Sequence, residues 1–183
     1  MARRGRGPGG GLAPVRRRAA IGKVRDFYRH RIGYATSDVD RFAVYSDMFI
    51  AVHNRLARRH GQQAEQARKE AIDLLWTEIG NAVAYLAEES PVTGRPRARL
   101  EVTDRFSSDL ADAVNATDTA NDALQALTAA FIAVQNRRAA HDPDAATRAY
   151  TDVNTRLARA CEQALQITAK SIRVREDRRD HAA

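Results

Sequence analysis

Apolar residues recur at alternating three- and four-residue spacings along most of this chain of 183 residues. This spacing places apolar side chains in one stripe along an α-helix. The longest series runs through Phe106, Leu110, Ala113, Thr117, Ala120, Leu124, Leu127, Phe131 and Val134. Runs of β-branched residues are few, and alanine and arginine, both good helix formers, are abundant. The pattern therefore predicts an all-α protein.

The first pair of predicted helices forms a hairpin over residues 38–89. Ser37 is a suitable N-cap, and Asp38 and Asp40 favour the positive end of the helix dipole. Gly61 separates this helix from a second one that continues to residue 89. A short connection between two long amphipathic helices implies an antiparallel pair.

A second hairpin is predicted over residues 103–175. The segment before it, SPVTGRPRARLEV (90–102), contains two prolines and a glycine, so we expect a surface loop with a short extended piece at 100–102. Within the hairpin, one helix extends from residue 103 to about residue 141. The next begins at Pro143, with Asp142 as its N-cap.

The two hairpins together predict an antiparallel up-down-up-down four-helix bundle over residues 34–175, followed by a frayed tail at 176–183. The helix that begins at residue 103 is longer than its partners in the first hairpin. It overhangs them unless it breaks at the polar segment 115–122 (NATDTAND). An overhang would expose apolar side chains, and the preceding helix, a second copy of the chain or another protein would have to cover them.

The N-terminal region accounts for the positive charge of the chain. Residues 1–31 contain ten basic residues and one acidic residue, whereas 32–183 carry a net charge of −2. Residues 1–14 hold five glycines and two prolines, which predicts a disordered Arg/Gly-rich tail. Residues 15–33 combine apolar spacing with many arginines, and this combination predicts a basic amphipathic helix that precedes the bundle.

A basic segment of this kind is typical of proteins that bind polyanions. Arginine binds phosphate through a planar fork, and counterion release drives the association. We therefore interpret the chain as a non-enzymatic accessory or assembly subunit that binds the DNA or RNA phosphate backbone largely without sequence specificity. The expected contact residues are Arg3, Arg4, Arg6, Arg16, Arg17, Arg18, Lys23, Arg25 and Arg29.

Three alternatives to this interpretation remain open. The chain could be a protein–protein scaffold or a self-associating helical subunit that docks a partner through its second hairpin and has no nucleic-acid role. The basic helix could bind an anionic membrane surface, although its apolar face is modest. The arm could also serve only to keep the protein soluble.

The sequence contains no recognisable catalytic or metal-binding motif. Cys161 is the single cysteine, which excludes an internal disulfide, and its place on an apolar helix face is typical of an inert core residue. The Glu-x-x-His motif of di-iron bundles does not occur, and His53 and His60 fit structural positions. We expect neither a metal nor a cofactor.

No stretch of about 18 apolar residues is present, so we expect no membrane span. The twin arginines Arg3 and Arg4 are followed by glycines rather than by an apolar segment, which argues against an export signal. The expected location is the cytoplasm.

Overall fold

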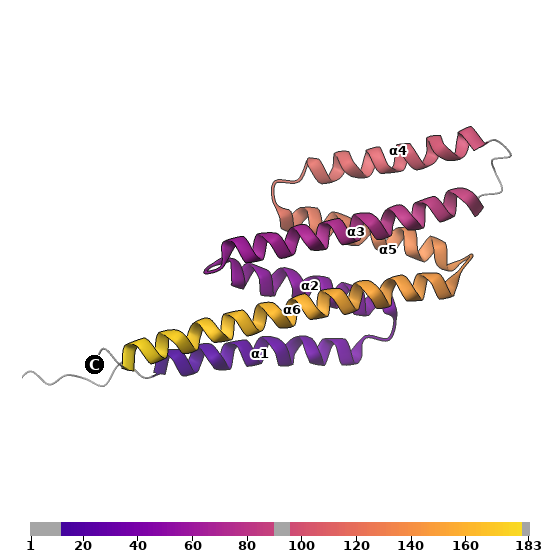
Figure 1. Ribbon diagram of the computed structural model, residues 1–183. Helices are drawn as coiled ribbons and strands as arrows, with labels where there is room; N and C mark the ends of the chain where they lie inside the picture. The colour runs from indigo at the N-terminus through magenta and orange to yellow at the C-terminus, as the bar shows by residue number, and fades with distance from the viewer. Residues whose placement is uncertain (1–11, 90–95, 181–183) are drawn as a thin grey trace, which may run out of the picture.

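The computed structural model of the protein describes residues 12–89 and 96–180, with side chains over most of these ranges. This part of the chain is all-helical, as the apolar spacing predicts, and it contains six helices and no strand. The helices are α1 (Leu12–Tyr34), α2 (Asp38–Ala57), α3 (Gly61–Glu89), α4 (Pro96–Asn115), α5 (Ala120–Ala139) and α6 (Pro143–Asp180) (Figure 1).

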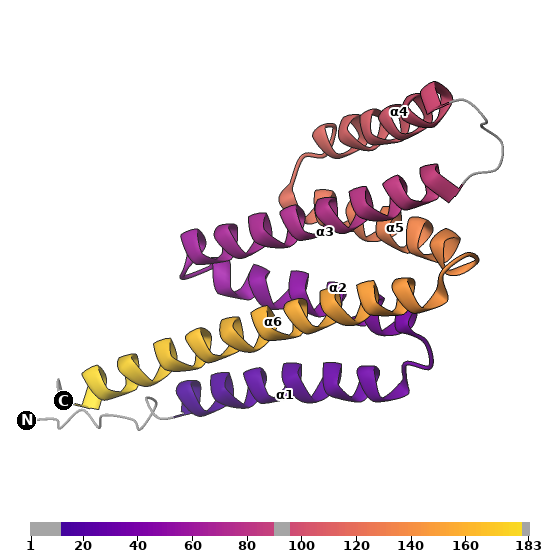
Figure 2. The same ribbon diagram turned by 45° about the vertical axis from the view of Figure 1, so that its right-hand side comes forward.

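The helices are stacked in layers (Figures 1 and 2). α2 lies beside α6 and α3 lies beside α5, and these two pairs face each other across the core. α1 covers the outer side of the α2–α6 pair, and α4 covers the outer side of the α3–α5 pair. The largest fully buried side chains include Phe42 and Phe49 of α2, Leu75 of α3 and Phe131 of α5.

Helices that follow each other in the chain run in opposite directions (Figure 1). Because α4 lies between α3 and α5 in the sequence, α3 and α5 run parallel, and so do α2 and α6. The expected up-down-up-down order of four helices over residues 34–175 is therefore wrong. The error arises at residues 116–119, where the chain turns back instead of continuing as one helix.

Thr119 ends the continuous helix that the apolar spacing suggested. It is the N-cap of α5: the Asp122 backbone N–H donates to the Thr119 hydroxyl at 3.2 Å, and that hydroxyl donates to the Asp122 carboxylate at 2.6 Å. The turn folds α4 back along α3 and α5. The helix from residue 103 therefore does not overhang the first hairpin, but α6 runs past the α2–α3 turn, and there α1 lies beside it, as one of the three expected covers would (Figures 1 and 2).

Helix ends differ from the predictions in three further places. α4 begins at Pro96, so residues 100–102 are helical and not extended. Proline is well suited to this first position because its missing N–H is not needed there. α1 begins at Leu12, three residues before the predicted start, and α6 continues to Asp180 through a segment expected to fray. Most of the predicted disordered tail lies outside the described residues.

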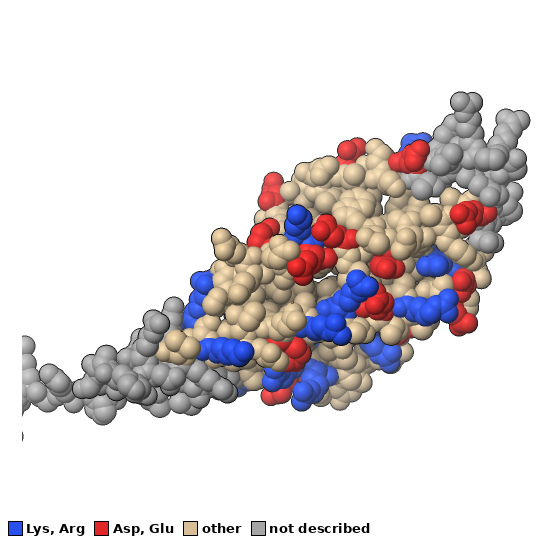
Figure 3. All heavy atoms as spheres, in the orientation of Figure 1, with Lys and Arg blue, Asp and Glu red and all other residues tan. Residues whose placement is uncertain are grey.

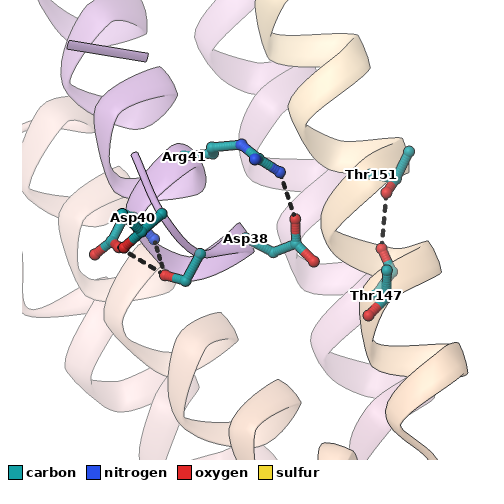
Figure 4. Close-up of polar contacts among 7 residues, drawn as sticks. Asp38, Asp40, Arg41, Thr147 and Thr151 are labelled. Carbon is teal, nitrogen blue, oxygen red and sulfur yellow. Dashed lines mark hydrogen bonds and ion pairs between the residues drawn. The ribbon is translucent and has the colours of Figure 1, made fainter. Parts of the chain in front are cut away.

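The start of α2 forms as predicted. The Asp40 backbone N–H donates to the Ser37 hydroxyl at 3.1 Å, which confirms Ser37 as the N-cap. The Ser37 hydroxyl in turn donates to the Asp40 carboxylate at 2.8 Å, and this hydrogen bond lowers the pKa of Asp40. Asp38 pairs with Arg41 at 3.2 Å. Figure 4 shows this first turn beside the α6 segment that carries Thr147 and Thr151.

The start of α6 also forms as predicted. The Ala145 backbone N–H donates to the Asp142 carboxylate at 2.9 Å, and Pro143 is the first helical residue. The N-caps at Ser37 and Asp142 could both be predicted because a cap depends only on atoms of neighbouring residues.

Candidate nucleic-acid interface

The nine predicted contact residues fall into three groups. Arg3, Arg4 and Arg6 lie outside the described residues. Arg16, Arg17 and Arg18 belong to the first part of α1, where the helix but not the side chains is described. Lys23, Arg25 and Arg29 lie further along α1, and among these Lys23 and Arg29 are exposed to solvent.

Arg25 was expected to be available for phosphate, but it forms an ion pair within the protein. Its guanidinium donates to the carboxylate of Glu162 on α6 at 2.7 Å, so it attaches α1 to α6. Arg31 makes a similar link to Asp47 on α2 at 3.1 Å. The described basic side chains of α1 thus fall into two groups: Arg25 and Arg31 form ion pairs that hold the helix in place, while Lys23 and Arg29 are exposed to solvent.

A groove opens where α1, α2 and α6 meet. It consists of a hollow of about 570 Å³ and an adjoining one of about 270 Å³, which share Arg55, Arg58 and Thr168. We call the two hollows together the basic groove. Its basic lining residues are Lys23, Arg55, Arg58 and Arg59. Within the described part of the chain no acidic side chain lines it.

The floor of the basic groove is apolar. Buried side chains from all three helices form it: Ile21 from α1, Val52 from α2, and Leu165 and Ile172 from α6. Phe27 stands in the wall on the α1 side. An apolar floor between positively charged rims is suited to a ligand with apolar flat groups and a negatively charged backbone.

Local sequence explains why the arginines of α2 gather at this point. The segment NRLARRH (54–60) ends α2, and basic side chains are favoured near the negative end of the helix dipole.

The Ser171 hydroxyl donates to the Ile167 carbonyl at 2.9 Å, so His60 Nε2–H must be the donor in its 2.6 Å hydrogen bond to the Ser171 oxygen. This bond holds the α2–α3 turn against α6.

The basic groove lies toward the end of the molecule that holds three basic segments. The start of α1, the α2–α3 turn and the end of α6 all lie toward this end (Figures 1 and 2). The last part of α6 carries Arg173, Arg175, Arg178 and Arg179 in its sequence. On the face shown in Figure 3, most basic side chains lie over α1 and α6, whereas acidic side chains dominate over α3 and α4.

A second groove, of about 560 Å³, runs between α3 and α6. Its α3 wall is acidic through Glu70, Asp73 and Glu78, and its α6 wall is basic through Arg156 and Arg159. Arg156 is already paired with Asp152 at 3.0 Å. The acidic wall repels a polyanion, so this groove is a poor phosphate site.

Burial shifts the pKa values of two side chains in the core, Cys161 and His53. Burial raises the pKa of the Cys161 thiol to about 12, which keeps it protonated and unreactive. Burial lowers the pKa of His53, whose Nδ1–H donates to the Phe49 carbonyl at 2.8 Å. Among the described residues no group of three His, Cys, Asp or Glu side chains is placed to hold a metal ion.

Sequence reasoning missed Arg55, Arg58 and Arg59. The signal was present as three arginines within five residues just before the turn at Gly61. Their association with Lys23 depends on how α1 packs against α2 and α6, and this packing cannot be read from local spacing.

Comparison of the chain with models of known protein families, with curated proteins and with solved structures gave no match. None of the described helices has the length and apolar character needed to cross a membrane. The residues of the basic groove are therefore the feature of this chain that indicates a function.

Proposed function

We propose that this protein is a non-enzymatic nucleic-acid-binding protein that holds the phosphate backbone in its basic groove. One observation carries the proposal: Lys23 of α1, Arg55 of α2 and Arg58 at the C-cap of α2 line a single hollow that no described acidic residue lines. None of these three side chains has an ion-pair partner among the described residues. Their charges are available to an anionic ligand.

The frame of the site in this proposal is a four-helix bundle made by α2, α3, α5 and α6. α1 attaches to it through Arg25 and Arg31 and brings Lys23 to the groove. The sequence before α1 adds three further arginines, Arg3, Arg4 and Arg6, whose positive charge favours the same anionic ligand. A backbone that crosses the groove would thus meet several basic groups in succession, and each neutralised phosphate releases counterions that favour binding.

Binding of this kind is largely independent of base sequence. Asn54 is the only amide side chain among the described lining residues, and amides are the groups that read adenine. Its oxygen already accepts hydrogen bonds from Arg68 at 2.8 Å and from Asn121 at 2.9 Å. The remaining groove side chains offer charge and apolar surface, which every nucleotide can use.

The test is a variant that carries Lys23→Gln, Arg55→Gln and Arg58→Gln. Its affinity for a labelled oligonucleotide at low salt should fall by about tenfold or more, because three phosphate contacts are lost. The control variant carries Arg105→Gln, Arg137→Gln and Arg148→Gln, which removes the same charge from exposed positions outside the groove.

The control separates local contacts from overall charge. It should bind almost as tightly as the unaltered protein. If the two triple variants lose affinity equally, net charge alone attracts the nucleic acid and the groove has no special role. If neither loses affinity, the proposal is wrong.

A further inference from the structure

Phe27 is an exposed aromatic side chain in the wall of a basic groove. It is 57% exposed, although a phenylalanine gains most when it is buried. It lies one helical turn after Lys23, so that the ring and the ammonium group share one face of α1. Across the groove stand Arg55 and Arg58.

Neighbouring side chains hold the Phe27 ring in place. The ring packs edge to face against Tyr28, with 5.1 Å between ring centroids, and the Arg31 Cζ atom lies 5.8 Å from its centroid. Tyr28 is half-buried, and its hydroxyl donates a long hydrogen bond to the Asp47 carbonyl at 3.4 Å. A ring held in this way loses little freedom when a flat ligand stacks on it.

Aromatic rings beside basic side chains are the usual means of binding single-stranded nucleic acid, because every base has a flat face that can stack. In a duplex the bases are already stacked inside the helix and cannot reach a side chain in a groove wall. We infer that the basic groove takes a single strand in preference to a duplex, with a base stacked on Phe27 and the flanking phosphates at Lys23, Arg55 and Arg58. This inference rests on the proposed function and names its substrate class.

The apolar floor supports the same substrate class. Ile21, Val52 and Leu165 offer the groove a surface without hydrogen-bonding groups. The bases and sugars of an open strand can cover such a surface, whereas a duplex presents mainly phosphates to its surroundings.

The experiment compares the binding of a labelled oligothymidylate with the binding of a blunt-ended duplex of the same length. Phe27→Ala should weaken single-strand binding by about 5- to 150-fold, the usual effect of removing one stacking partner, and leave duplex binding unchanged. Phe27→Trp keeps an aromatic ring at this position, so this variant should bind the single strand about as tightly as the unaltered protein does. Tyr34→Ala is the control, because Tyr34 is an exposed aromatic residue of the same helix that lies outside the groove.

The outcomes separate this inference from the proposed function. If the triple groove variant loses affinity for both ligands but Phe27→Ala leaves the ratio of single-strand to duplex affinity unchanged, the stacking inference fails and the proposed function stands. An equal loss for Phe27→Ala and Tyr34→Ala also overturns the inference. If the triple groove variant binds both ligands as tightly as the unaltered protein, the proposed function itself fails.

Discussion

Gln135 of α5 is fully buried, and neither its amide nitrogen nor its amide oxygen has a hydrogen-bond partner in the described part of the chain. A buried polar group without a partner costs about 1–3 kcal/mol. Leucine has nearly the same size and no polar atom. Gln135→Leu should therefore raise the free energy of unfolding by about 1–3 kcal/mol. For a chain of this length, this gain corresponds to a rise of roughly 2–12 °C in Tm.

The assay is urea denaturation followed by far-UV circular dichroism, which reports directly on helix content. Gln125→Leu is the control, because Gln125 lies on the same helix but is exposed. An exposed substitution of this type changes stability by no more than about 0.5 kcal/mol. If Gln135→Leu destabilises the protein relative to Gln125→Leu, the amide is hydrogen-bonded and the reasoning is refuted.

Three buried side chains, Cys161, Phe131 and His53, have properties that can be measured directly. Cys161, with its pKa raised to about 12, should resist iodoacetamide at mildly alkaline pH in the folded protein and react once urea unfolds it; labelling of the folded protein would contradict its burial. Phe131→Ala should cost about 3–5 kcal/mol of stability in urea denaturation, because the ring is fully buried 4.7 Å from that of Phe42, whereas Phe27→Ala should cost almost nothing. His53 has a folded-state pKa below its ordinary value of 6.5, so the unfolded chain takes up the proton first. Its contribution to stability should be constant above about pH 6.5 and fall as the pH is lowered toward the folded-state pKa, and His53→Asn should remove this fall.

The parts of the fold that depend on neighbouring residues could be predicted from the sequence. Ser37 and Asp142 act as N-caps as expected, since a cap depends on backbone N–H groups two or three residues away. The stripe of α2 that includes Phe42, Phe49 and Val52 is buried as its spacing predicts.

The topology could not be predicted in the same way. The three- and four-residue spacing runs through residues 115–122 and favours one continuous helix, whereas the polar composition of this segment left a break open without showing that the chain turns back there. Thr119 and Asp122 form two hydrogen bonds with each other that cap the start of α5. These bonds compete with the backbone hydrogen bonds of a continuous helix over the same four residues. Because the chain turns back at this cap, α5 runs opposite to α4, and α3 and α5 run parallel.

The candidate site was only partly accessible from the sequence. Charge counting directed attention to nine basic residues of the N-terminal region, and Lys23 is one of them. It also suggested that Arg25 is available, although Glu162, far away in the sequence, pairs with it. The contribution of Arg55 and Arg58 depends on the packing of α1 against α2 and α6, which is a tertiary property.

The most direct test of the basic groove as a phosphate site is the salt dependence of binding to a single-stranded oligonucleotide. Each lost phosphate contact reduces the slope of log K against log salt concentration by about 0.7. The variant with glutamine at positions 23, 55 and 58 should therefore show a slope smaller by about 2 than that of the unaltered protein. The control variant with glutamine at positions 105, 137 and 148 should keep the original slope. Equal slopes for the unaltered protein and the groove variant would contradict the account.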